Sequence, residues 1–133
     1  EWTVLGQTQL LLVILGVLLI GLAVYIGITM FAANAEEATR NAMIHDLQNF
    51  APHALAYYSK PIGQAGGGKS FSGLTIRVIF PMVENANARY FIESASQESC
   101  VIVGIGRVVT SDGDSVRVRI RVTPQRNIVE ILN

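Results

Sequence analysis

The sequence predicts an α+β fold, in which a long N-terminal hydrophobic helix is followed by a small antiparallel β-sheet. Three observations predict it. No charged residue occurs between Trp2 and Ala35, apolar residues then recur at helical spacing, and from residue 74 onward they alternate as in strands. We therefore divide the chain into a helix over residues 1–60, a glycine-rich linker over 61–73 and a β-domain over 74–133.

The run from Leu10 to Ala33 is apolar on every side of the predicted helix. About 20 such residues cross the hydrocarbon core of a bilayer, whereas a soluble helix of this length carries a polar stripe. A secretory signal peptide begins with basic residues and has a shorter apolar core, but here the first basic residue is Arg40. We expect a helix surrounded by lipid or by other copies of itself, in a chain that has already been processed, because it begins with Glu1 rather than Met.

Residues 34–59 predict an amphipathic continuation of the same helix. Pro52 is the first proline in the chain, so no proline interrupts the predicted helix before that position. We expect a helix that is continuous from about Val4 to at least Phe50, kinks at Pro52 and ends near Ser59. The apolar residues that recur at helical spacing are Ala35, Ala38, Ala42, Leu47, Ala51, Ala54 and Tyr58.

Strands are predicted over residues 74–80, 89–94, 100–110, 116–123 and 127–132. Asp112-Gly113 is a signal for a two-residue type I′ turn, and this turn pairs Val109 with Val116. The pairing predicts a buried face formed by Val103, Ile105, Val109, Val116, Ile120 and Val122. It turns Arg117, Arg119 and Arg121 toward solvent. We expect the buried face to lie against Leu47, Ala51, Leu55 and Tyr58 of the helix.

The segment Gly63 to Ser70 matches the P-loop pattern GxxxxGK[ST]. A P-loop cradles phosphates between a preceding strand and a following helix. Here a predicted helix precedes the segment and a predicted strand follows it. We interpret the segment as a flexible linker.

No other motif predicts catalysis or a bound metal, so we expect neither an enzyme nor a cofactor. A calcium loop would need 12 residues that end in a carboxylate, and the hairpin turn already explains Asp112 and Asp114. His45 and His53 are too far apart on the helix to be paired ligands, and the polarity of His45-Asp46 is interpreted as solvent-facing. Cys100 has no second cysteine to pair with and is expected to be a buried structural thiol.

A hydrophobic N-terminal helix that continues as an amphipathic helix and leads through a loop into a small antiparallel sheet resembles the type IV pilin-like family, which includes bacterial pilins, pseudopilins and archaeal pilins. Gly6 to Leu10 looks like the cleavage junction of that family, so the mature N-terminus is either Glu1 or the residue after Gly6. The glutamate that the family often has at its fifth mature position has no counterpart, since Leu5 occupies it if the chain begins at Glu1. The helix without an early proline is more similar to that of archaeal pilins.

The resemblance implies a structural subunit of an extracellular filament on the cell surface. Its partners would be further copies of itself in a helical homopolymer, the membrane before assembly, and the pilus assembly machinery. The net charge of zero predicts no nucleic-acid partner. The alternative is a single-pass membrane-anchored protein whose β-domain binds a partner or ligand, and the role of a filament among adhesion, motility, DNA uptake and conduction stays open. The predicted assembly interface comprises Leu10, Leu11, Leu12, Ile14, Gly16, Leu18, Gly21, Val24, Ile26, Gly27 and Phe31.

Overall fold

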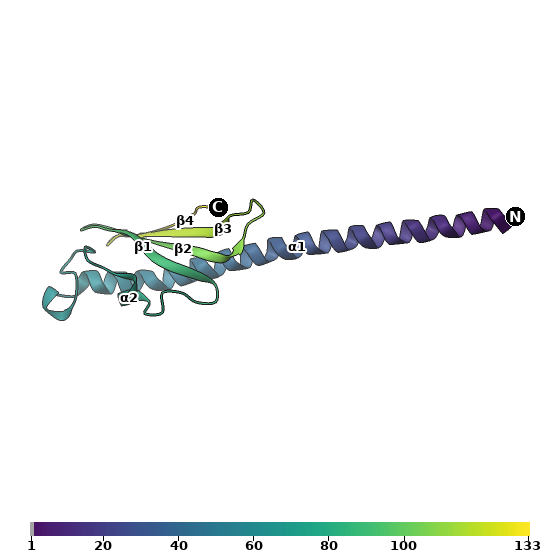
Figure 1. Ribbon diagram of the computed structural model, residues 1–133. Helices are drawn as coiled ribbons and strands as arrows, with labels where there is room; N and C mark the ends of the chain where they lie inside the picture. The colour runs from purple at the N-terminus through teal and green to yellow at the C-terminus, as the bar shows by residue number, and fades with distance from the viewer. Residues whose placement is uncertain (1) are drawn as a thin grey trace. The chain divides into compact units, whose positions relative to one another are not determined.

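The computed structural model describes residues 2–133, with side chains from Leu5 onward. Helix α1 spans Trp2–Ser59 without interruption and contains Pro52 (Figure 1). The chain divides into two compact units, Glu1–Asn34 and Ala35–Asn133, with α1 continuing from the first into the second. The predicted α+β fold and the continuous helix are confirmed.

From Trp2 onward the first unit is helix alone, and no described segment covers the apolar side chains from Leu5 to Phe31. The large apolar residues from Leu5 to Phe31 are between 47% and 76% exposed. The helix is long and apolar enough to cross a membrane, judged by length and composition, and none of its most apolar window is buried in the protein. Such a surface is compatible with insertion into a membrane.

The second unit contains a four-stranded antiparallel sheet with the strand order β1-β2-β3-β4. The strands are β1 (Ala88–Ala95), β2 (Cys100–Val109), β3 (Ser115–Val122) and β4 (Asn127–Ile131). Four of the five predicted strands are confirmed to within two residues at each end.

The core of the second unit lies between one face of the sheet and residues 43–54 of α1. The side chains of Tyr90 and Met43 pack directly over Gly104, since a Cβ atom added there would lie 2.8 Å from the Tyr90 ring and 3.1 Å from the Met43 side chain. Burial raises the pKa of the Cys100 thiol to about 11, as expected for a structural cysteine. The residues of this core that are 0% exposed include Met43, Leu47, Ala51, Ala54, Tyr90, Cys100, Ile102, Val116, Val118, Ile120 and Val122.

The predicted register of the β2–β3 hairpin is wrong. Ile102 pairs with Ile120, and Gly104 pairs with Val118. The turn has three residues rather than two, because the Thr110 N–H donates to the Asp114 carbonyl (2.7 Å) and only Gly113 is left-handed (φ 93°). The extra turn residue moves Val109 to the opposite face, and an irregularity between Ile105 and Val109 shifts the pairing by two further residues, which leaves the rest of β2 reversed as well.

The new register redistributes the residues that were predicted to be buried together. Val116, Ile120 and Val122 are fully buried beneath the sheet as predicted. Val103 is also buried (5% exposed), but Val103 and Ile105 pair with Arg119 and Arg117 and so lie on the outer face with them. Val109 is 56% exposed.

The strand predicted over residues 74–80 is also wrong, since this stretch contains the short helix α2 (Ile76–Ile79). The edge of β1 that such a strand would join is already taken, because the Tyr90 N–H donates to the Val83 carbonyl (2.9 Å). The apolar residues of this segment are not buried alternately as in a strand. Leu74 and Ile79 are buried, whereas Val78 is exposed.

The glycine-rich segment 61–73 folds back onto the end of α1 and includes a short 3-10 helix, η1 (Ile62–Gln64). The N–H groups of Gly67 and Lys69 donate to the carbonyls of Tyr57 (2.8 Å) and Tyr58 (2.7 Å), which satisfies carbonyls at the helix end. The segment is thus a cap on α1 rather than an open linker. The N–H groups of Gln64 to Lys69 donate to carbonyls of the same chain, so they are not available to a phosphate.

Replacing Lys69 with glycine should stabilise the second unit. Lys69 is exposed and has φ 64°, a conformation that costs a non-glycine residue about 1 kcal/mol. We expect Lys69→Gly to raise the free energy of unfolding by about 0.5–1 kcal/mol, measured by urea denaturation of residues 35–133. Lys60→Gly, at a position without positive φ, is the control and should give no gain. A destabilised Lys69→Gly protein would contradict the prediction.

Candidate functional site

The predicted assembly residues all lie on α1 within the first unit, and the large ones among them are exposed. They point to all sides of the helix rather than forming one stripe. A Cβ atom added to Gly16, Gly21 or Gly27 would meet nothing within 4 Å in the described chain. Nothing in the fold of this chain therefore requires glycine at these three positions.

The residues singled out for possible metal binding do not converge. No group of three or more His, Cys, Asp or Glu residues in the described part of the chain is placed to hold a metal ion. His45 and His53 are exposed on α1, and Asp112 and Asp114 are exposed at the β2–β3 turn.

A partly buried polar cluster around Asp46 was not predicted. The Oδ2 atom of Asp46 accepts hydrogen bonds from the Tyr90 hydroxyl (2.5 Å), Asn85 Nδ2 (2.9 Å) and Asn87 Nδ2 (3.4 Å). Burial and the Asp46 carboxylate raise the pKa of Tyr90 far above its ordinary value, so this hydroxyl remains a donor. The cluster fixes α1 to the start of β1. Its partners are up to 44 residues apart, and no sequence motif links them.

Tyr90→Phe should test the strength of this cluster. The substitution removes a hydrogen bond to a charged group and should lower the free energy of unfolding by about 2 kcal/mol. Chemical denaturation of residues 35–133 gives the value. Tyr57→Phe is the matched control, because the Tyr57 hydroxyl makes only an exposed bond to the Ser72 carbonyl (3.2 Å). Equal losses in the two variants would show that Asp46 contributes nothing special.

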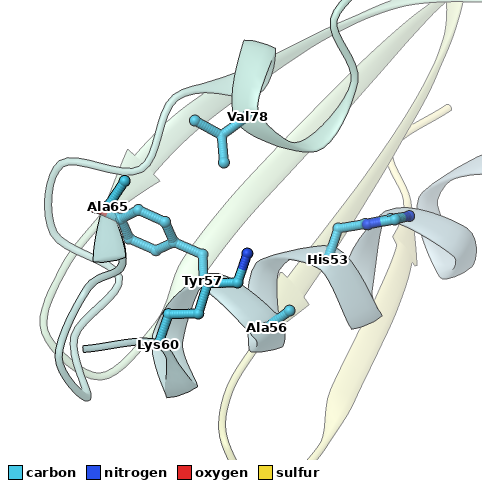
Figure 2. A pocket seen from close by; sticks show the side chains of 6 residues that line it. All are labelled: His53, Ala56, Tyr57, Lys60, Ala65 and Val78. Carbon is cyan, nitrogen blue, oxygen red and sulfur yellow. The ribbon is translucent and has the colours of Figure 1, made fainter. Parts of the chain in front are cut away.

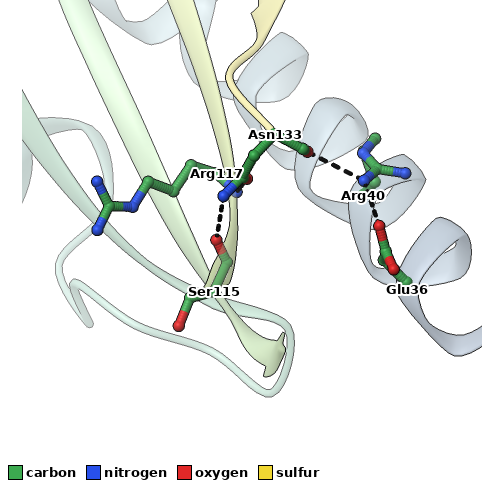
Figure 3. A network of polar contacts seen from close by, with 5 residues as sticks. All are labelled: Glu36, Arg40, Ser115, Arg117 and Asn133. Atoms are coloured by element: carbon green, nitrogen blue, oxygen red, sulfur yellow. Dashed lines mark hydrogen bonds and ion pairs between the residues drawn. The ribbon is translucent and has the colours of Figure 1, made fainter. Parts of the chain in front are cut away.

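A second polar network joins α1 to β3 through Asn133 (Figure 3). Arg40 Nη2 donates to Glu36 Oε1 (2.8 Å) and to the Asn133 carbonyl (3.0 Å). The Asn133 side chain accepts from the Arg117 N–H (2.7 Å) and donates to the Ser115 carbonyl (2.9 Å). The Glu36–Arg40 pair follows from their spacing of four residues on the helix, whereas the role of Asn133 has no sequence signal.

A small hollow lies between the end of α1, η1 and α2 (Figure 2). Its volume is about 100 Å³, which is well below the size of clefts that enclose small molecules. We assign it no ligand. The residues that line it are His53, Ala56, Tyr57, Lys60, Ala65 and Val78.

The outer face of the sheet carries a second hollow, of about 180 Å³. Arg119 crosses this face, with its Nε atom 2.9 Å from Glu130 Oε2 and its Nη1 atom 3.9 Å from Glu93. The hydrogen bond and charge of Glu130 raise the pKa of Arg119, and those of Arg119 lower the pKa of Glu130. The predicted outward orientation of the β3 arginines is confirmed. The hollow is lined by Phe91, Glu93, Val103, Ile105, Arg117, Arg119 and Leu132.

Comparison with known proteins finds no matching family, no similar curated protein and no similar solved structure. A function for this chain must therefore be argued from its own surfaces.

Proposed function

We propose that this chain is a structural, non-catalytic subunit of an extracellular filament of the type IV pilus kind. In this proposal the run from Leu10 to Ala33 lies in the membrane before assembly. It then packs among the same segments of neighbouring copies, while the second units form the outer wall.

The exposed apolar surface of the first unit is the observation that carries the proposal. Each apolar Å² left in water costs about 25 cal/mol, and the apolar side chains of this unit are exposed on every side of α1. A bilayer covers such a surface, and so does a bundle of identical helices. A subunit that passes from membrane to filament needs one surface that suits both surroundings.

The glycines of α1 favour packing between helices over contact with lipid alone. Gly16, Gly21 and Gly27 are not required by the fold of the single chain. Glycine also costs about 1 kcal/mol relative to alanine in a helix. Small residues let helix backbones approach closely, which gives these glycines a use in a bundle that a lone anchor does not need.

The second unit supports the proposal because it buries its own core without the apolar run. Its sheet packs against residues of α1 beyond Ala42, namely Met43, Leu47, Ala51 and Ala54. The first unit therefore contributes no described residue to the core of the sheet domain. It remains available for contacts with other molecules.

The second candidate function is a single-pass membrane protein whose β-domain binds a partner. The length and composition of α1 are sufficient for such an anchor, and the hollow on the outer face of the sheet offers a surface for a partner. This candidate gives no reason for glycine at positions 16, 21 and 27.

Mechanical shearing of cells that express the chain separates the two candidates. A filament subunit should be released without detergent and should sediment as an assembly at high speed. A lone anchor should stay with the cells and dissolve only in detergent. Recovery of the chain from the detergent extract alone would overturn the filament proposal.

A further inference from the structure

The outer face of the sheet presents an apolar floor between arginines that have no acidic partner. Ile105 of β2 pairs with Arg89 on one side and with Arg117 on the other. The two arginines are thus two strand spacings apart, or about 10 Å. Neither makes an ion pair with any described residue, unlike Arg119. The side chain of Arg117 extends away from the Asn133 network (Figure 3).

The apolar floor around Ile105 is only partly covered. Phe91 and Val103 lie in the next cross-strand row, beside Arg119, and Leu132 lies on the far side of Arg117. Phe91 is 39% exposed and Leu132 is 42% exposed, whereas Val103 is 5% exposed. One acidic side chain, Glu93, also lines this hollow and is already near Arg119. A partner that fits this hollow needs a narrow tip with acidic groups at its sides and an apolar group beside them. Such a tip would form ion pairs with the two arginines and would exclude water from the apolar floor.

The β2–β3 turn of the same chain has this chemistry. Asp112 and Asp114 are exposed and form no ion pair with described residues, and Val109 beside them is 56% exposed. The turn is held by hydrogen bonds from the Thr110 N–H to the Asp114 carbonyl (2.7 Å) and from the Gly113 N–H to the Thr110 carbonyl (3.0 Å). It is therefore pre-organised for binding, which reduces the entropy lost on association.

We propose that the β2–β3 turn of one copy docks into the arginine-flanked hollow on the outer face of another copy, with Asp112 and Asp114 pairing with Arg89 and Arg117. The turn and the hollow are different surfaces of one chain, so the contact is heterologous. Repetition of a heterologous contact that does not close on itself produces an open filament. This inference rests on the proposed function and adds to it a contact between the sheet domains.

Disulfide trapping between two singly substituted full-length chains tests the contact. One chain carries Ser111→Cys at the turn, and the other carries Leu132→Cys at the hollow. The native Cys100 is 0% exposed and should not interfere. When the two chains are expressed together and oxidised on cells, we expect a cross-linked dimer that is missing when either is expressed alone. Gln97→Cys, at an exposed position in the β1–β2 loop, replaces Leu132→Cys in the matched control.

Charge reversal makes the test specific. Asp112→Lys with Asp114→Lys in the first chain should abolish the dimer, and Arg89→Glu with Arg117→Glu in the second chain should restore it. Equal cross-linking to the Gln97→Cys control, or cross-linking that survives the first reversal, overturns the docking proposal. Sheared filaments without the cross-link overturn the docking and leave the filament standing. A chain found only in the detergent extract, without the cross-link, overturns both.

Discussion

Gly21→Leu should abolish filaments while leaving membrane insertion intact. In a bundle, the added side chain would enter space that a neighbouring helix occupies, and such overpacking costs about 1–3 kcal/mol at each site. In a bilayer, the added leucine would only increase the apolar surface. We expect the yield of sheared filaments to fall at least about tenfold, with the amount of chain in the membrane unchanged. Quantitative blotting of the two pools measures both.

Three further variants separate packing from insertion. Gly16→Leu should act like Gly21→Leu, whereas Gly21→Asp should reduce membrane insertion as well, because a charge at mid-membrane costs about 3 kcal/mol. Leu19→Met keeps the side-chain volume nearly constant and should preserve filaments. Filaments at the wild-type level in Gly21→Leu cells would favour the single-pass membrane anchor.

Ile120→Asp should prevent the second unit from folding. Ile120 is 0% exposed and lies between Ile102 and Val129 in the sheet. An uncompensated buried charge costs about 3–5 kcal/mol, which is a large part of the stability of a small domain. Circular dichroism of residues 35–133 should show loss of the cooperative unfolding transition.

Val109→Asp is the control for Ile120→Asp, and it also tests the register of the hairpin. A two-residue turn would bury Val109 together with Val116, whereas in the structure Val109 is 56% exposed. Val109→Asp should therefore fold with nearly unchanged stability. An unfolded Val109→Asp domain would contradict the observed register, and a folded Ile120→Asp domain would contradict the burial of Ile120 in the core.

Periodic features of the fold could be predicted because each is repeated over many residues. The helix follows from an apolar run without proline before Pro52, and β3 follows from the alternation of Val116 to Val122. The register depends instead on one turn residue and on the irregularity between Ile105 and Val109, and Asp112-Gly113 is compatible with turns of two or three residues. Residues 74–80 alternate like a strand, but the edge of β1 was already paired with Val83.

The exposure of the candidate assembly residues could be predicted because it needs only one apolar helix. The large apolar residues from Leu10 to Phe31 are exposed because no described segment of the chain covers them. The contacts of Asp46 with Tyr90 and of Arg40 with Asn133 join residues 44 and 93 positions apart. These contacts depend on how the sheet packs against α1, so they cannot be predicted from local sequence patterns. The apolar residues on the outer face of the sheet could not be predicted either, because the predicted register placed Val103 and Ile105 on the inner face.

Helical reconstruction of sheared filaments by electron cryo-microscopy tests the central claim most directly. The account predicts filaments built from this chain, with residues 10–33 as an unbroken helix in contact with several neighbouring copies. It also predicts Gly21 facing a neighbouring backbone and the sheet domains on the outside. Filaments in which residues 10–33 lose several helical residues, or in which this run contacts no neighbouring helix, would contradict it.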